Sequence, residues 1–302
     1  MKFKIWLGAA RLRTLPLSLS GIITGTALAN FSDKKDPIIF GLCLLVTIGF
    51  QVTSNFANDY GDGVKGTDGE DRIGPKRALQ SGALTPEELK RGIISTSIIS
   101  LVLVVILLYR VFGWNNLPYF AVFLFLGGIS IWAAIKYTVG DSAYGYRGLG
   151  DVFVFLFFGL LAVLGTKFLY TRTLMIVDVL PAVAIGLLCA GVLNLNNLRD
   201  IRSDSNHGKN TLVVKMGFLN GKRYHFFLLL LSFATILSFC FFSGFSMLTI
   251  LIVITPFLFI AMHGIKVLKT KNPADLDPEL KKLALSTFLV SLLFYLTINY
   301  FL

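Results

Sequence analysis

Charged residues are scarce in this 302-residue sequence. Asp, Glu, Lys and Arg make up 15% of it, whereas soluble globular proteins contain roughly 25%. Hydrophobic residues account for 55%, the mean hydropathy is +0.72, and the apolar residues form long uninterrupted blocks. This composition excludes a disordered chain, a coiled coil, a nucleic-acid-binding domain and an ordinary cytosolic enzyme. It indicates a polytopic membrane protein.

Cysteine and histidine are also rare, with three residues of each. Cys43, Cys189 and Cys240 lie far apart inside apolar stretches, and their spacing matches no metal-binding or redox motif. We expect them to be small buried hydrophobic residues. The histidines are scattered as well: His263 is expected at a helix end, and only His207 lies near candidate chemistry.

Nine windows meet or approach the length of about 20 apolar residues that a bilayer-spanning helix needs. They are residues 15–31, 37–57, 92–112, 117–135, 152–171, 179–198, 226–242, 245–265 and 283–302. Ser243-Gly244 is the expected turn between two of these helices. The predicted fold is all-α, with nine transmembrane helices in a single bundle around a central cavity, and residues 1–302 form one domain.

The basic residues predict the orientation of the chain in the membrane. Assigning them to the loops places 23 of the 28 Lys and Arg residues on one side, which the positive-inside rule identifies as cytoplasmic. The N-terminus and the central cavity then face the cytoplasm, and the C-terminus lies outside. An alternative is a cleaved secretory signal ending at Ala27-Leu28-Ala29, but Arg11 and Arg13, just before the apolar run, come late in the chain for the short basic n-region of such a signal.

Polar residues gather at the start of the two long cytoplasmic loops, 58–91 and 199–225. In the first cluster, Asn55, Asp59 and Asp62 are spaced by four and three residues and share one helix face. The second cluster has Asn196, Asp200 and Asp204, spaced by four and four. Each cluster ends an even-numbered span, so we expect two half-sites that face each other.

Carboxylates in this arrangement suit a hard cation. Mg²⁺ is typically held by one or two carboxylates together with substrate phosphates. Two facing pairs therefore predict two Mg²⁺ ions that bridge a diphosphate. Each cluster alone could be a solvated helix cap, but two matched clusters on one side favour a site. Basic residues flank both clusters: Arg72, Lys76, Arg77, Arg199, Arg202 and Lys209.

With these motifs the sequence resembles the UbiA-type intramembrane prenyltransferases, and most closely their branch that acts on 1,4-dihydroxy-2-naphthoate in menaquinone synthesis. The matching segments are Asn55-x2-Asn58-Asp59-Tyr60-x-Asp62-x3-Gly66-x-Asp68, Arg72-x-Gly74-Pro75-x-Arg77, Asn196-Asn197-x-Arg199-Asp200-x3-Asp204-x3-Gly208-Lys209 and Tyr144-Gly145-Tyr146-Arg147-Gly148-Leu149-Gly150-Asp151. The similarity extends over essentially the whole chain. It implies Mg²⁺-dependent transfer of a polyprenyl group from polyprenyl diphosphate to the naphthoate, with loss of CO₂ and diphosphate, to give demethylmenaquinol.

The resemblance also implies roles for individual residues. The catalytic and metal-binding acids are Asp59, Asp62, Asp200 and Asp204, with Asn55 and Asn58 as further metal ligands. Diphosphate would be bound by Arg72, Lys76, Arg77, Arg199, Lys209, Asn196 and Asn197. Candidates for the pocket of the acceptor or the allylic cation are Tyr60, Tyr137, Tyr144, Tyr146 and Arg147, and Asp68 completes the first motif. The active-site loops are 58–91, 136–151 and 199–225.

The expected partners are the two substrates and membrane lipid, without nucleic acid or an obligate protein partner, and the expected location is the cytoplasmic (inner) membrane. Three alternatives stay open. A sister prenyltransferase would act on 4-hydroxybenzoate, homogentisate or haem. A CDP-alcohol phosphatidyltransferase matches only the start of its signature, at Asp59-x2-Asp62-Gly63. A cation-coupled transporter would carry its acids nearer the membrane midplane.

Overall fold

The structure is a computed structural model that describes residues 2–67 and 73–302. Within these ranges all regular secondary structure is helical. The predicted all-α membrane fold is thereby confirmed at the level of its class. Asp68 and Arg72, which the sequence analysis assigned to the first motif and to diphosphate binding, lie outside the described residues.

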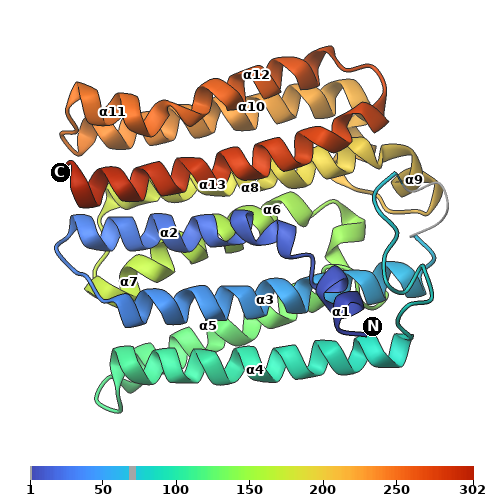
Figure 1. The fold of residues 1–302 in the computed structure, drawn as a ribbon, viewed down its shortest axis with the longest axis horizontal. Helices are drawn as coiled ribbons and strands as arrows, with labels where there is room; N and C mark the ends of the chain where they lie inside the picture. Colours follow the sequence, from blue (N-terminus) through green and yellow to red (C-terminus); the bar gives the residue numbers. More distant parts are fainter. Residues whose placement is uncertain (1, 68–72) are drawn as a thin grey trace. The chain divides into compact units, whose positions relative to one another are not determined.

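Eight helical segments of the described chain are long and apolar enough to cross a membrane. Three of them are the single helices α3, α4 and α5, and the others join shorter pieces or occupy part of a longer helix (Figure 1). The eight segments are Pro37–Val64, Pro86–Phe112, Leu117–Lys136, Gly150–Thr171, Ile176–Arg199, Phe218–Phe242, Met247–Lys269 and Pro273–Tyr300.

The composite segments change helix type along their length. The segment Gly150–Thr171, which contains the predicted window 152–171, is built from α6 (Gly150–Val154), the π-helix η3 (Phe155–Gly165) and α7 (Thr166–Thr171). The other elements are α1 (Lys2–Ala10), η1 (Leu12–Thr14), α2 (Leu15–Phe31), α3 (Pro37–Val64), α4 (Pro86–Phe112), α5 (Leu117–Lys136), η2 (Tyr144–Arg147), η4 (Ile176–Asp178), α8 (Val179–Arg199), α9 (Ile201–Asn206), α10 (Leu212–Phe242), α11 (Met247–Ile254), α12 (Pro256–Lys269), η5 (Pro273–Leu276) and α13 (Asp277–Tyr300).

The first apolar window forms α2, whose bounds Leu15–Phe31 match the predicted range. With 17 residues it is shorter than the other membrane-length helices, and 12 of its residues are buried. Gly21 and Gly25 let its backbone approach the π-helix segment closely, because an added Cβ would meet Ala162 or the Val163 carbonyl at 2.6 and 2.4 Å. This helix is therefore enclosed by protein.

Local sequence explains where several helices begin and end. Thr85 caps α4, since its side chain accepts a hydrogen bond from the Glu88 N–H and the Glu88 side chain accepts one from the Thr85 N–H. The expected turn at Ser243-Gly244 is confirmed: α10 ends at Phe242, and Gly244 adopts φ 72°, a conformation that favours glycine. The turn thus separates α10 from the segment formed by α11 (Met247–Ile254) and α12 (Pro256–Lys269).

The chain forms two compact units, each assembled from separate segments. The first unit comprises Met1–Leu15, Pro37–Gly150 and Arg202–Thr211, and the second comprises Pro16–Asp36, Asp151–Ile201 and Leu212–Leu302. In the first unit, Phe56, Leu84 and Leu89 belong to an apolar cluster beneath the end of α3. In the second, a larger cluster joins residues of α2, α8 and α10 to α13. These cores fix the helix ends that carry the candidate site.

Candidate active site

The first aspartate motif occupies the last two turns of α3 in the first unit. Asp59 and Asp62 are both buried, and they lie on the helix face predicted from their spacing. The Asp59 carboxylate accepts hydrogen bonds from the N–H groups of Ala78 and Leu79, at 3.1 and 3.2 Å. These bonds fasten the loop that follows α3 onto the acidic face of the helix.

Asp62 is the centre of a charged cluster. Its Oδ2 accepts a 2.7 Å hydrogen bond from Arg77, whose guanidinium also donates to the carbonyl of Asn58 at 2.7 Å. Its Oδ1 accepts a 2.8 Å hydrogen bond from the hydroxyl of Tyr146. Lys209 lies 3.8 Å from Oδ2. Three distant segments of the chain therefore converge on one carboxylate.

Tyr146 keeps its proton in this environment. Burial and the neighbouring Asp62 carboxylate raise the pKa of the Tyr146 phenol above its ordinary value, so the hydroxyl acts as a hydrogen-bond donor. Because that hydrogen goes to Asp62, the Thr67 hydroxyl, 2.6 Å away, donates to Tyr146. The Tyr146 carbonyl accepts the N–H of Asn210, which ties loop 136–151 to the segment that follows α9.

Lys209 connects the two aspartate motifs within the first unit. Its Nζ lies 3.8 Å from Asp62 and 3.8 Å from Asp204, the last acid of the second motif. Burial disfavours the ammonium charge, but Asp62 and Asp204 outweigh it and raise the pKa of Lys209, so the side chain stays protonated. Lys209 therefore lies beside one acid of each motif, Asp62 and Asp204.

Asp200 lies in the second unit, at the end of α8. Both of its carboxylate oxygens accept hydrogen bonds from Arg199, from Nε at 2.8 Å and from Nη2 at 2.6 Å. Arg199 also contacts Asp277 at 2.7 Å and Asn196 Oδ1 at 3.0 Å. The pair is buried, and Arg199 holds Asp200 in a fixed bidentate geometry.

The asparagines of the first motif have structural partners. Asn55 donates to the Ala10 carbonyl at 2.8 Å, which anchors α1 to α3, and its Oδ1 accepts a 3.3 Å hydrogen bond from Gln51. Asn58 Oδ1 accepts a 3.2 Å hydrogen bond from Thr138. Gly61 fits beside that residue only without a side chain, because an added Cβ would lie 2.6 Å from Thr138 Oγ1.

The predicted aromatic residues do not form one wall. Tyr146 lies at Asp62, with Lys65 Nζ 4.0 Å from its ring centre. Tyr144 instead donates its hydroxyl to the Ala133 carbonyl at 2.8 Å and packs edge-on against Tyr137. Tyr60 packs with the apolar cluster beneath α3, and Arg147 ends η2 with an exposed side chain. Of the four tyrosines, the structure brings Tyr146 to the acidic cluster.

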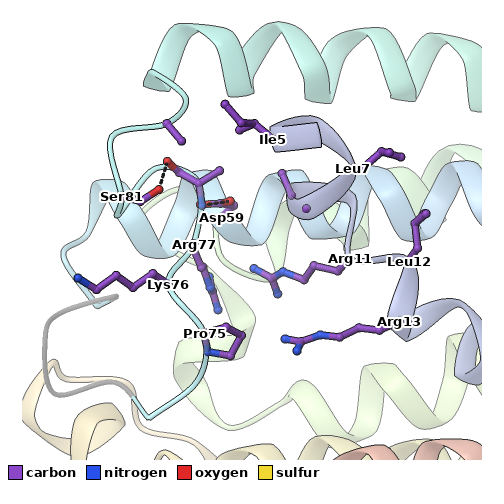
Figure 2. A pocket seen from close by; sticks show the side chains of 14 residues that line it. Ile5, Leu7, Arg11, Leu12, Arg13, Asp59, Pro75, Lys76, Arg77 and Ser81 are labelled. Atoms are coloured by element: carbon purple, nitrogen blue, oxygen red, sulfur yellow. Dashed lines mark hydrogen bonds between the residues drawn. The ribbon is translucent and has the colours of Figure 1, made fainter. Parts of the chain in front are cut away.

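An open pocket of about 490 Å³ lies between α1 and the loop after α3. Figure 2 shows Arg11, Arg13 and Arg77 with their guanidinium groups toward the same space, with Asp59 at its edge, while Lys76 extends away from them. Arg11 turns the chain between α1 and η1 with φ 49°, a left-handed conformation uncommon outside glycine. Three guanidinium groups around one space favour an anionic ligand.

Arg11 and Arg13 were missed as site residues by the sequence analysis. They were predicted only as charges that set the orientation in the membrane, because Lys and Arg are expected before the first span on the cytoplasmic side. In the structure, the left-handed turn at Arg11 and the contact of α1 with Asn55 bring this segment to the first motif. No sequence periodicity encodes that contact.

The donor set fits Mg²⁺ better than a transition metal. Among the described residues, no group of three or more His, Cys, Asp or Glu side chains is arranged to hold a metal without other ligands. Asp59, Asp62 and Asp204 are buried carboxylates within one unit, and oxygen donors of this kind suit a hard cation. Mg²⁺ is usually bound in this way, by one or two carboxylates completed by waters and substrate phosphates.

Comparison with known proteins identifies the family of this chain. Residues 18–296 match the sequence pattern of the UbiA prenyltransferase family. The chain belongs to this family. It is therefore a multi-pass membrane prenyltransferase, and the resemblance on which the sequence analysis relied is confirmed.

Relatives with assigned activities cover nearly the whole chain. The 1,4-dihydroxy-2-naphthoate octaprenyltransferase of Escherichia coli (strain K12) is 44% identical over 97% of this chain and 94% of its own. The protein of the same name from Haemophilus influenzae is 43% identical over 98% and 96%. A UbiA homolog from Archaeoglobus fulgidus, bound to DMAPP and Mg²⁺, shares the fold with a TM-score of 0.62 at 14% identity, covering 96% of this chain and 99% of that one.

Proposed function

We propose that this chain transfers a polyprenyl group from polyprenyl diphosphate to 1,4-dihydroxy-2-naphthoate, releasing CO₂ and diphosphate and giving demethylmenaquinol. The observation that carries this proposal is the 43–44% identity, over nearly the full length, to two relatives named for that acceptor. The family membership supports the reaction class, and the charged cluster around Asp62 supports a diphosphate substrate.

The acids of both motifs would hold Mg²⁺, for which we propose two ions together with the donor diphosphate. Asp59, Asp62, Asp200 and Asp204 would supply the carboxylate ligands, aided by Asn55 and Asn58. The bound metal would neutralise charge on the leaving diphosphate. The Archaeoglobus fulgidus homolog, bound to DMAPP and Mg²⁺, supports a metal requirement in this fold.

The cations would act on the leaving group. Arg77 and Lys209 already lie beside Asp62, so they can hold negative charge that develops as the carbon–oxygen bond of the donor breaks. Arg72, Lys76, Arg199, Asn196 and Asn197 complete the proposed diphosphate ligands. Tyr146 would wall the allylic cation, with Tyr60, Tyr137, Tyr144 and Arg147 as the other proposed pocket residues and Asp68 as part of the first motif.

We also propose the finer membrane arrangement. Counting α2 with the eight longer segments gives nine crossings, with a cytoplasmic N-terminus, an external C-terminus and a site facing the cytoplasm of the inner membrane. The distribution of Lys and Arg among the loops supports this orientation. The organisation of residues 1–302 as one domain stays a prediction.

A comparison of two acceptors in separate assays tests the proposed reaction. Purified protein in detergent receives a polyprenyl diphosphate, Mg²⁺ and either 1,4-dihydroxy-2-naphthoate or 4-hydroxybenzoate. We expect diphosphate release and a prenylated naphthoquinol with the first acceptor only, and no product after addition of EDTA. A prenylated benzoate as the main product would instead assign the chain to a sister reaction.

A further inference from the structure

A layer of polar residues lies inside the second unit, where α8 packs antiparallel to η3 and α10. Phe155, Ala190 and Leu228, one from each of these helices, meet in a single apolar cluster. Four residues away, toward the helix ends on one side, stand three polar residues: Asp151, Asn194 and Tyr224. Four residues make about one helical turn, so all three lie one turn beyond the apolar cluster.

Several polar atoms in this layer have no protein partner. Asn194 is 0% exposed, and neither its amide nitrogen nor its amide oxygen is hydrogen-bonded within the described residues. Asp151 is 4% exposed, and its Oδ2 likewise has no partner there. Asn197, three residues beyond Asn194 on the same helix face, adds an unpartnered Oδ1. Buried groups of this kind cost stability unless something binds them.

The environment of Asp151 differs from that of the other buried acids in this unit. Asp178 contacts Lys167, Asp200 contacts Arg199, and Glu279 contacts two lysines. The Asp151 carboxylate instead lies beside the Tyr224 hydroxyl. It thus keeps an acceptor oxygen available in a protein interior that neutralises its other acids with cations.

We propose that Asp151, Asn194 and Tyr224 bind the aromatic acceptor by its polar substituents. A dihydroxylated aromatic acid offers hydroxyl donors for Asp151 and for the amide oxygen of Asn194, and oxygen acceptors for the Asn194 amide hydrogens. The apolar cluster of Phe155, Ala190 and Leu228 suits its flat ring. This inference rests on the proposed function for the identity of the acceptor.

The position of Asp151 in the chain supports this assignment. Asp151 directly follows the segment 144–150, which carries Tyr146, and Tyr146 is hydrogen-bonded to Asp62 of the first motif. One loop therefore leads from a residue of the proposed diphosphate site into the polar layer. A contact between the acceptor and Asp151 would couple acceptor binding to the proposed diphosphate site through a short length of backbone.

Conservative variants separate acceptor binding from a structural role. Asn194→Leu, Asp151→Asn and Tyr224→Phe are compared with wild type by steady-state kinetics and by calorimetric titration of 1,4-dihydroxy-2-naphthoate. The matched control is Thr297→Val in the same unit, near the C-terminal end of α13, which removes a fully buried hydroxyl that also has no partner among the described residues. Thermal unfolding in detergent monitors the fold of each variant.

We expect Asn194→Leu and Asp151→Asn to raise the KM for the naphthoate at least about tenfold, the equivalent of one lost buried hydrogen bond or more. The KM for polyprenyl diphosphate should stay within about twofold, as for the Thr297→Val control. Asn194→Leu should unfold at the same or a higher temperature, because it removes unsatisfied buried groups. An acceptor analogue lacking one hydroxyl should lose affinity for wild type but not for Asp151→Asn.

Two results would separate failure of this inference from failure of the proposed function. If wild type prenylates the naphthoate while the three variants keep its acceptor KM and affinity, the polar layer does not bind the acceptor. If folded wild-type protein does not use the naphthoate at all, the proposed reaction itself is wrong. A fall in unfolding temperature for Asn194→Leu with unchanged acceptor affinity would assign the layer a purely structural role.

Discussion

The two aspartate motifs satisfy the same chemical need with different parts of the chain. Asp62 of the first motif is held by Arg77, Tyr146 and Lys209, which come from three separate loops. Asp200 of the second motif is held by its chain neighbour Arg199 in a bidentate pair. Both acids are buried, and both have a guanidinium partner.

This difference predicts which substitutions should disturb each motif. The geometry around Asp62 depends on loops that must close over the end of α3, so changes in those loops should alter catalysis. The geometry around Asp200 is set locally at the end of α8 and is fixed further by the contact between Arg199 and Asp277. Changes there should affect stability as well as catalysis.

Removing an acid from either motif should have the largest effect. Asp62→Asn and Asp200→Asn each lose a negative charge that the proposed metal–diphosphate complex requires, so kcat should fall at least about a hundredfold in both. Diphosphate release measures this loss, and thermal unfolding checks the fold. Near-normal turnover in one of the two variants would mean that the motifs are not equivalent halves of one site.

Replacing the guanidinium partners should distinguish the motifs. Arg77 donates to the Asn58 carbonyl and to Asp62 from one nitrogen, Nη1, and the compact ammonium of lysine does not match the shape or reach of the guanidinium, so we expect Arg77→Lys to lower kcat about tenfold with little change in unfolding temperature. Arg199→Lys should lower both quantities, because a buried bidentate pair is broken. Equal losses of stability in the two variants would remove the proposed distinction.

Removing the hydroxyl of Tyr146 should lower kcat less than these changes do. Tyr146→Phe removes the hydroxyl hydrogen bond to Asp62, and one such bond is worth about 1 kcal/mol or slightly more, so kcat should fall about fivefold. Tyr144→Phe is the control for the hydroxyl alone: it keeps the ring of this proposed pocket residue and loses only the hydrogen bond to the Ala133 carbonyl, so kcat should stay unchanged. A greater kcat loss in Tyr144→Phe than in Tyr146→Phe contradicts the placement of Tyr146 at the site.

The ion pair between Lys167 and Asp178 should have the least effect on turnover. Both side chains are buried, at an N···O distance of 2.5 Å, outside the aspartate motifs. Lys167→Met leaves Asp178 unpaired and should lower the free energy of unfolding by about 3–5 kcal/mol, and adding Asp178→Leu should recover most of it. Steady-state kinetics should give comparable kcat values for folded wild type and variants. Denaturant unfolding measures the predicted changes in the free energy of unfolding.

Much of the fold could be predicted because hydropathy acts locally. Seven of the nine apolar windows lie wholly within helical structure, the windows 245–265 and 283–302 also include a few non-helical residues, and the boundary at Ser243-Gly244 was predicted correctly. The π-helix η3 could not be predicted, because its sequence Phe155–Gly165 is as apolar as an ordinary span. The close contact of Gly159 with Gly186, where an added Cβ would lie 2.5 Å from the partner Cα, depends on packing between helices.

The site was predictable only where chemistry and spacing coincide. Asp59 and Asp62 were found from their helical spacing, whereas Arg11 was assigned to topology. The expectation that His263 lies at a helix end was wrong: it is buried in the middle of α12, where it contacts both His225 at 3.0 Å and Glu279 at 2.8 Å. Contacts among α10, α12 and α13 are set by tertiary packing, which no local pattern specifies.

The central claim is that both aspartate motifs bind the donor diphosphate through Mg²⁺. It is tested most directly by titrating a non-ionising polyprenyl thiolodiphosphate into the purified protein, with Mg²⁺ or with EDTA. We predict binding to wild type only with Mg²⁺, and loss of that binding in both Asp62→Asn and Asp200→Asn. Equal affinity in EDTA, or unchanged Mg²⁺-dependent affinity in either variant, would contradict the claim.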